Sequence, residues 1–326
     1  MILSKLGGLG MLMAASALLS APQTTTQTAP AQKGRRGNPK ETEVWEPVPK
    51  VVTPGADNSA PPSDAIVLFD GKNLDEWVQT KDKSPAEWIV RDGVLVVNKA
   101  RGVGNIETKR RFRNFQLHVE WKFPVDLTGA DQDRGNSGVF LASTGGGDAG
   151  YELQILDSYN NKTYVNGQAG SIYKQGIPLV NPSRRPGEWQ SYDVVWMAPV
   201  FESDGKVRTP AYATVFFNGV LVQNHFELSG ETLFIGKPFY RKYETAPIKL
   251  QAHGDPSQPI GFRNIWVREL NPHATLGNGT HNSLENGVHA LPHGDVRTRR
   301  SPVSGPVNQP GGNGRRESAK IAVAKL

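Results

Sequence analysis

The sequence predicts an all-β fold in which two antiparallel sheets stack face to face. Between residues 65 and 270, short strand-like runs alternate with turn signals. No long stretch of this region repeats its apolar side chains with the 3.6-residue period of a helix. Internal repeats are also missing from the sequence, so about a dozen short strands are expected to form a single sandwich.

Two β-hairpins are the clearest elements. Residues 87–90 and 94–97 flank a turn that contains Asp92-Gly93, and residues 212–217 and 220–222 flank Asn218-Gly219. Asp-Gly and Asn-Gly favour the positive φ angles that tight hairpin turns require. Further strands are expected at 115–123, 137–142, 151–156, 190–197, 247–252 and 260–270.

Alternation along three of these strands indicates which polar side chains share a face. In 115–123 the odd positions are apolar, so His118 and Glu120 project together from the opposite face. In the same way, Glu152 lies beside Gln154, and His253 lies beside Gln251. Such a face is either a solvated sheet surface or the concave, ligand-binding side of a jelly roll, and periodicity alone favours the solvated surface.

The two ends of the chain differ in composition from this body. Residues 1–21, with Lys5, an apolar run too short to span a membrane comfortably and small residues before Pro22, predict a secretory signal peptide. Residues 22–63 are expected to be an extended, disordered linker, and residues 272–326 a disordered basic tail. We therefore expect a periplasmic or secreted mature protein without a transmembrane segment.

Charge and cysteine content exclude several classes of function. The net charge of +6 divides into +2 for residues 1–62 and +4 for 272–326, which leaves the body neutral and argues against a nucleic-acid partner. The chain has no cysteine, which excludes disulfides, thiolate metal sites, a cysteine nucleophile and the acylated cysteine of a lipoprotein.

Several motifs within residues 64–271 resemble, in order and spacing, the 3-keto-disaccharide hydrolase domain family. They are Leu-Phe-Asp-Gly-Lys-Asn-Leu-Asp at 68–75, Gly-Asn-Ser-Gly-Val-Phe at 135–140, Gly-Tyr-Glu-Leu-Gln-Ile-Leu-Asp at 150–157, Pro-Gly-Glu-Trp at 186–189, Leu-Gln-Ala-His-Gly at 250–254 and Ile-Gly-Phe-Arg-Asn-Ile at 260–265. The resemblance implies a concanavalin-A-like jelly-roll sandwich, distantly similar to glycoside hydrolase family 16, that processes carbohydrate.

The chemistry that this resemblance implies is cleavage of 3-keto glycosides. The ketone acidifies the hydrogen on C2, so a base can remove it, the enolate can expel the C1 substituent, and water can then add. Glu152 or His253 would be the base. Asp157 is a candidate proton donor, and Glu152, Asp157 and His253 together could hold a divalent metal ion.

Further residues are candidates for binding the substrate, a carbohydrate that a sugar 3-dehydrogenase would supply. Arg263 or Lys174 could stabilise the enolate, and Glu120 is a second candidate proton donor. Gln154 and His118 complete this group because they share a strand face with the residues already named. The assignment requires Glu152, Asp157, His253 and Arg263 to converge in one concave pocket.

Each of these residues also has a structural alternative, and so does the function. Asp157 could cap a turn, His253 could bond the backbone, and Arg263 could form a structural ion pair. A non-catalytic carbohydrate-binding module on the same jelly roll is the alternative function. An ordinary two-carboxylate glycosidase is disfavoured, because no Glu-x-Asp-x-x-Glu run occurs.

Overall fold

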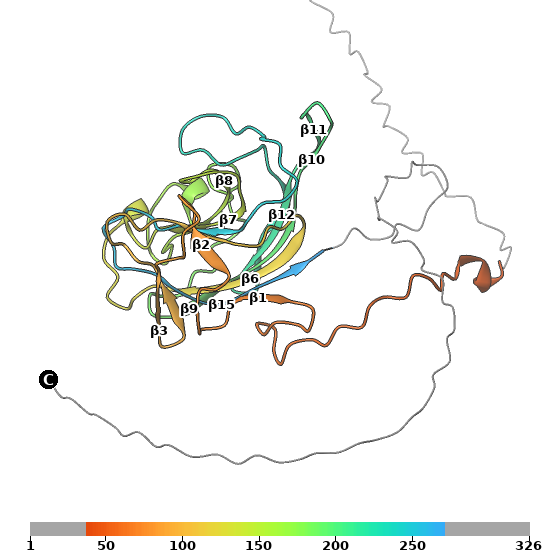
Figure 1. Ribbon diagram of the computed structural model, residues 1–326, viewed down its shortest axis with the longest axis horizontal. Coiled ribbons are helices and arrows are strands. Elements are labelled where there is room, and N and C mark those ends of the chain that lie inside the picture. Colours follow the sequence, from red (N-terminus) through yellow and green to blue (C-terminus); the bar gives the residue numbers. More distant parts are fainter. Residues whose placement is uncertain (1–36, 271–326) are drawn as a thin grey trace, which may run out of the picture. The chain divides into compact units, whose positions relative to one another are not determined.

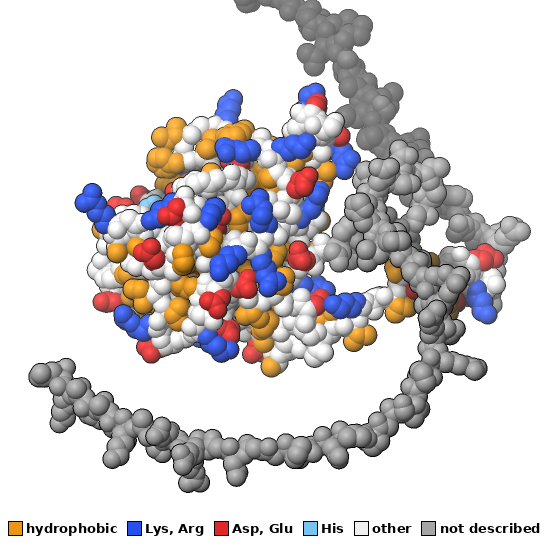
Figure 2. All heavy atoms as spheres, in the orientation of Figure 1, with side chains coloured by type: hydrophobic (Ala, Val, Ile, Leu, Met, Phe, Trp, Pro, Cys, Tyr) orange, Lys and Arg blue, Asp and Glu red, His pale blue; other side chains and the backbone are white. Residues whose placement is uncertain are grey.

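The computed structural model describes residues 37–270 of the chain (Figure 1). The predicted signal peptide, the first part of the predicted linker and the predicted basic tail lie outside these residues. No helix of the described part is long and apolar enough to cross a membrane. On the face shown in Figure 2, side chains of both charges are spread over the domain, in agreement with its neutral net charge.

Two antiparallel sheets form the domain, which confirms the predicted all-β class. The larger sheet has the order β13 (Val220–Glu227), β12 (Tyr212–Phe217), β9 (Trp189–Met197), β6 (Phe115–Lys122), β15 (Gly261–Glu269), β4 (Val94–Val96) and β3 (Ile89–Arg91), and β1 (Ile66–Phe69) also pairs with β15. The smaller sheet has the order β2 (Trp77–Gln79), β5 (Ile106–Thr108), β14 (Lys249–Leu250), β7 (Ser137–Ser143) and β8 (Gly150–Ile155).

The remaining elements are short. A two-stranded ribbon pairs β10 (Val200–Phe201) with β11 (Val207–Thr209), and three single 3-10 turns occur at η1 (Pro39–Thr42), η2 (Asp131–Asp133) and η3 (Val165–Gly167). Both predicted hairpins are confirmed as β3–β4 and β12–β13. Their turns have positive φ at Asp92 (51°) and Asn218 (51°) and at the glycine that follows each.

Aromatic side chains between the two sheets make up much of the core. In β6, the buried Trp121 ring lies 4.4 Å from the ring of Tyr192 and 5.5 Å from that of Phe217, so three adjacent strands share one aromatic layer. Across the sandwich, Tyr151 of the smaller sheet lies 5.4 Å from Trp196 of the larger one. Rings of this size bury much apolar area, which holds the sheets face to face.

The last residues of the predicted linker contact the domain. The carbonyl of Ser59 accepts hydrogen bonds from Asn264 Nδ2 (2.9 Å) and Trp266 Nε1 (2.8 Å), both on β15. The ring of Trp266 stacks on His118 at 5.4 Å, and His118 is only 1% exposed. The sequence does not reveal this contact because a backbone carbonyl makes it. The polar face of β6 is thus partly covered, whereas periodicity favoured a solvated surface.

Candidate active site

A row of side chains crosses the smaller sheet on the face turned away from the core. The antiparallel register places Glu107 of β5 beside Lys249 of β14, Lys249 beside Phe140 of β7, and Phe140 beside Glu152 of β8. The ammonium group of Lys249 lies 4.6 Å from the centre of the Phe140 ring. This face therefore carries charged groups on a closely packed sheet, which is unusual for an ordinary solvated surface.

A pocket lies over β7, β8 and the residues that follow β14. One part has a volume of about 260 Å³ and a second part about 410 Å³, and the two share Asn136, Tyr173, Phe234 and His253. We call the whole cavity the sheet pocket. Its further lining residues are Gln132, Asp148, Glu152, Gln154, Tyr164, Thr232 and Gln251. The cavity is in the size range of small-molecule sites.

Glu152 is a buried carboxyl group without an ion-pair partner in the described part of the chain. The residue is 5% exposed, and none of the described residues donates a hydrogen bond to its carboxylate. Burial raises the pKa of Glu152 to about 8, and the charge of Asp148 adds to this rise while Lys249 opposes it. This carboxyl group can therefore exchange a proton near neutral pH.

The surroundings of Glu152 explain why it stays unpaired. Lys249 Nζ donates to the carbonyls of Gly145, Gly147 and Ala149 at 2.8–3.2 Å, so its hydrogen bonds go to the loop between β7 and β8. The carboxylate of Glu152 lies over Gly138, where a Cβ atom would be 2.5 Å from Oε1. A glycine at position 138 thus leaves the space that this carboxyl group occupies.

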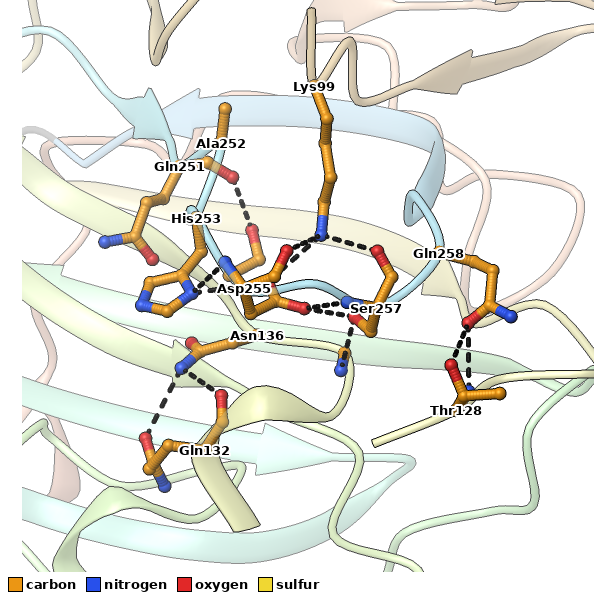
Figure 3. Close-up of polar contacts among 12 residues, drawn as sticks. Lys99, Thr128, Gln132, Asn136, Gln251, Ala252, His253, Asp255, Ser257 and Gln258 are labelled. Carbon is orange, nitrogen blue, oxygen red and sulfur yellow. Dashed lines mark hydrogen bonds and ion pairs between the residues drawn. The ribbon is translucent and has the colours of Figure 1, made fainter. Parts of the chain in front are cut away.

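His253 faces the same pocket from the chain that follows β14 (Figure 3). Its Nδ1 atom lies 3.3 Å from Asp255 Oδ2 and 3.2 Å from the backbone nitrogen of Asp255. Nε2 has no hydrogen-bond partner among the described residues, and the side chain is 35% exposed. The ring is therefore anchored through one nitrogen, and the other is free to form a hydrogen bond with a ligand.

Asp255 is in turn anchored by the residues behind it. Lys99 Nζ lies 3.1 Å from Asp255 Oδ2, and the backbone N–H of Ser257 donates to Oδ1 at 2.9 Å, as Figure 3 shows. Burial opposes ionisation of Asp255, but hydrogen bonds from His253, Ser257 and Lys99 outweigh it and hold the pKa at about 2. The sequence analysis missed Asp255 and Lys99, although the spacing His-Gly-Asp could have indicated the first.

Amide side chains form another wall of the sheet pocket. Gln154 Nε2 donates to Asn136 Oδ1 at 3.0 Å, and Asn136 Nδ2 donates to the carbonyl of Gln132 at 2.9 Å. The amide oxygens of Gln154 and Gln251 are buried and have no hydrogen-bond partner in the described part of the protein. Buried acceptors are normally satisfied, so these two oxygens fit a ligand that brings hydroxyl donors.

Three aromatic rings form the wall opposite the amides. The hydroxyl groups of Tyr164 and Tyr173 lie 2.7 Å apart, and Phe234 completes the wall while remaining 71% exposed. Lys174 Nζ lies 3.7 Å from the centre of the Tyr164 ring. Lys174 is therefore close to the aromatic rings of the sheet pocket, but it is not one of the residues that line the cavity.

Asp157 does not line the sheet pocket, so the prediction that it converges with Glu152 and His253 is wrong. Its Oδ2 atom lies 2.8 Å from Arg134 Nε, and its Oδ1 accepts from the backbone N–H of Tyr159 at 3.1 Å. Asp157 follows the end of β8, where the chain leaves the sheet and the alternation of faces no longer applies. Asp157 therefore caps a turn, which was its alternative role, and it also forms an ion pair with Arg134.

Arg263 does not reach the sheet pocket either, and neither do Glu120 and His118. Arg263 Nε lies 2.6 Å from Glu120 Oε2, and His118 Nδ1 lies 2.7 Å from Asp193 Oδ1, all on the outer face of the larger sheet. The predicted convergence fails because β6 and β15 pair within that sheet. Arg263 has the structural ion pair that was its alternative role.

Opposite charges in this outer cluster stabilise each other. Burial opposes the charge on His118, but Asp193 and Glu120 outweigh it and raise its pKa to about 9. Burial also opposes ionisation of Glu120, but bonds from His118, Asn264 and Arg263 lower its pKa to about 2. These groups are therefore charged at neutral pH, and they form their ion pairs and hydrogen bonds with one another.

The expected metal ligands do not assemble around one point. Glu152 and His253 line the sheet pocket, but the carboxylate of Asp157 is paired with Arg134 outside it. Within residues 37–270, no group of three or more His, Cys, Asp or Glu side chains is arranged to hold a metal ion. This set of three therefore does not fit a metal centre, and no chemical step below depends on one.

Comparison with known proteins decides the family. Residues 64–268 match the model of the 3-keto-alpha-glucoside-1,2-lyase-like domain. The chain belongs to this family. It is 29% identical to a 3-keto-disaccharide hydrolase from Bacteroides thetaiotaomicron over 242 residues, which cover 63% of this chain and 78% of that protein.

A solved structure resembles this 3-keto-alpha-glucoside-1,2-lyase-like domain closely. It is a protein from Parabacteroides distasonis, assigned provisionally as a glycosyl hydrolase, with 53% sequence identity and a TM-score of 0.66. The similarity covers 72% of this chain and 97% of that one. The family match at residues 64–268 spans the strands of both sheets except the last residue of β15, so the sheet pocket falls within the family domain.

Proposed function

We propose that the protein cleaves 3-keto glycosides, with Glu152 as the base that removes the hydrogen from C2. The observation that carries this proposal is the state of Glu152, which is buried, without a hydrogen-bond donor among the described residues, and has a pKa of about 8. A base is most effective when its pKa lies near the working pH. The family name and the hydrolase from Bacteroides thetaiotaomicron support the substrate class.

The proposed reaction has three steps. The Glu152 carboxylate takes the proton from C2, and the electron pair of the C2–H bond forms the enolate with the C3 ketone. The enolate then expels the C1 substituent, leaving a C1=C2 double bond conjugated to the restored ketone, and His253 Nε2 supplies the proton that the leaving oxygen needs. Water adds to C1 and a proton returns to C2, so the net result is hydrolysis.

The walls of the sheet pocket would hold the sugar in the required orientation. The unpartnered amide oxygens of Gln154 and Gln251 would accept hydrogen bonds from ring hydroxyls. The rings of Tyr173 and Phe234 would stack against the apolar face of a sugar. Asp255 would keep the His253 ring in place, since it contacts Nδ1 and leaves Nε2 toward the pocket.

We further propose that the mature protein acts in the periplasm or outside the cell, and that an oxidoreductase acting on the C3 hydroxyl supplies the substrate. The N-terminal sequence supports export. The chemistry supports the upstream reaction, because an unoxidised glycoside has no ketone to acidify C2. Cell fractionation with an antibody to residues 64–270 tests the first point, and a cytoplasmic location would contradict it.

The central experiment compares a 3-keto glucoside with its unoxidised parent. We expect release of the C1 group from the ketone only, and exchange of the C2 hydrogen in deuterated water. The value of kcat/KM should rise with pH, reach half of its plateau near pH 8 and level off above that pH. Glu152→Gln should abolish both exchange and cleavage, while the exposed Glu87→Gln should leave both unchanged.

Two further outcomes of this experiment would change the conclusion. If sugars bind but neither substrate is cleaved, the domain is a carbohydrate-binding module and the proposed reaction is wrong. Persistent C2 exchange in Glu152→Gln would show that another group is the base. A chelator in a parallel reaction tests the expected divalent ion, because loss of activity that added metal restores would establish a metal requirement.

A further inference from the structure

A second cavity lies beside the row of charged side chains on the smaller sheet, and it shares no lining residue with the sheet pocket. Its volume is about 340 Å³. We call it the basic pocket. It is lined by Lys83, Glu107, Arg111, Ser143, Thr144, Gly145, Arg241, Lys242, Tyr243 and Pro247. Four of these side chains are cationic and one is acidic, so the lining carries a positive net charge.

Two of the four cations are paired with carboxylates. Lys83 Nζ lies 2.6 Å from Glu107 Oε1, and Arg241 Nε lies 3.3 Å from Glu231 Oε1. Ser143 Oγ donates to the other oxygen of Glu107 at 2.9 Å. The carboxylate of Glu107 is therefore fully engaged, and it does not compensate further charge in the cavity.

The remaining two cations have no carboxylate partner in the described part of the chain. Arg111 Nη2 donates to the carbonyl of Thr245 at 2.5 Å, and Lys242 Nζ donates to the carbonyls of Glu202 and Ser203 at 3.3 and 3.2 Å. Backbone carbonyls hold these two side chains at the cavity without neutralising them. An arginine and a lysine fixed in this way form a ready site for an anion.

Two hydroxyl groups of lining residues point to the same kind of ligand. Thr144 Oγ1 and Tyr243 Oη are buried and have no hydrogen-bond partner among residues 37–270. Buried hydroxyl groups normally have a partner, and each can donate to an oxygen anion. The cavity thus offers both positive charge and neutral donors.

We infer that the basic pocket binds a small anion with a carboxylate, sulfate or phosphate group on a body about the size of one sugar ring. The volume of about 340 Å³ suits such a ligand, since small-molecule sites start at about 300 Å³. Arg111 Nε and Nη2 already donate to the hydroxyl and the carbonyl of Thr245, so Arg111 would bind the anion through Nη1 and the remaining N–H of Nη2, and Lys242 would add a second charge. This inference does not depend on the proposed chemistry at Glu152.

The basic pocket is a separate site from the one around Glu152. Three strand-to-strand steps separate Glu107 on β5 from Glu152 on β8. At about 4.8 Å for each step, their backbones are about 14 Å apart, which is more than the width of one sugar ring. The loop that Lys249 holds at Gly145, Gly147 and Ala149 follows β7, and Gly145 itself lines the basic pocket.

Binding to the full chain tests this inference. Calorimetric titration with glucuronate, glucose 6-sulfate, glucose 6-phosphate, glucose and inorganic sulfate should give at least tenfold tighter binding for one of the sugar anions than for glucose. Comparison of the dissociation constants of glucose 6-sulfate, glucose 6-phosphate and glucuronate identifies which anionic group is preferred. Arg111→Ala combined with Lys242→Ala should weaken that binding at least tenfold, and higher salt should weaken it in the unmodified protein.

Matched variants separate the basic pocket from other effects. Arg91→Ala removes an exposed arginine on β3 of the other sheet and should leave binding unchanged. Glu152→Gln should also retain anion binding, whether or not the proposed reaction is correct. The inference is overturned if glucose binds as tightly as the anions, or if the double variant binds normally while circular dichroism shows that it is folded. Binding of inorganic sulfate as tight as that of every sugar anion would indicate an adventitious ion only and would also overturn it.

Discussion

Replacement of Glu152 by glutamine should change how the stability of the protein depends on pH. In the folded protein the pKa of Glu152 is about 8, compared with an ordinary value of 4.5. Between these two pH values the unfolded chain releases this proton while the folded protein keeps it. The free energy of unfolding of the unmodified protein therefore falls as pH rises through this window, and the contribution is complete only below about pH 4.5.

The magnitude follows from the two pKa values. Each pH unit within the window costs up to about 1.4 kcal/mol, and integration from pH 5 to pH 8 gives about 3 to 4 kcal/mol. Glutamine has nearly the same shape and carries no proton to lose. The difference in unfolding free energy between Glu152→Gln and the unmodified protein should thus shift by about 3 to 4 kcal/mol in favour of the variant over this range.

Urea unfolding at pH 5, 6, 7 and 8 measures this shift. The exposed Glu87→Gln serves as the control, because an exposed carboxyl group has no comparable change in environment on unfolding. Only differences between variant and unmodified protein are compared, so titration of other groups cancels. If the difference for Glu152→Gln stayed constant from pH 5 to pH 8, the carboxyl group would be ionised inside the fold, and the reasoning about its basicity would fail.

Three other substitutions test the remaining parts of the site. Asp255→Asn should lower kcat at least tenfold with little change in KM, because His253 loses its charged anchor; steady-state kinetics on a 3-keto glucoside would measure this, and a normal kcat would contradict it. Asp157→Asn should lower the unfolding free energy in urea by about 1–3 kcal/mol, since Arg134 loses its carboxylate although burial already opposes the charge of Asp157 and raises its pKa, and it should not change KM. Phe234→Ala should raise KM about 2- to 10-fold at constant kcat if the ring stacks on the sugar, and an unchanged KM would exclude that contact.

Local patterns predicted the parts of the fold that depend on neighbouring residues. Asp92 and Asn218 have the positive φ angles that their hairpin turns require, so both hairpins followed from the sequence. Alternation within β8 also placed Glu152 and Gln154 on one face, and both line the sheet pocket. These features depend on backbone geometry over a few residues, which composition and spacing specify well.

Features that depend on strand pairing could not be predicted in this way. Arg263 and Glu120 lie 143 positions apart in the sequence, and only the pairing of β6 with β15 brings them together. Asp157 lies two positions beyond the end of β8, so the alternation that places Glu152 does not extend to it. The sequence analysis assigned all these residues to one site, Glu120 from the alternation along its strand and the others from motifs, whereas the fold divides them between two sheets and a turn.

The hydrogen-bond and ion-pair partners of a buried carboxyl group decide whether it is suited to proton transfer, as a comparison of Glu152 with Glu120 and Asp255 shows. Glu120 is bonded to Arg263 and Asn264, and Asp255 is bonded to Lys99 and Ser257; their bonds to positive and N–H groups hold both pKa values at about 2. Glu152 is at least as buried as these two, but no described residue donates a hydrogen bond to its carboxylate, and its pKa is about 8. Among these three carboxyl groups, burial without a partner makes Glu152 basic, whereas several partners outweigh burial and make Glu120 and Asp255 fixed charges. The candidate site uses both kinds: Glu152 lines the sheet pocket and can accept a proton, while the fixed charge of Asp255 orients His253 from outside the lining.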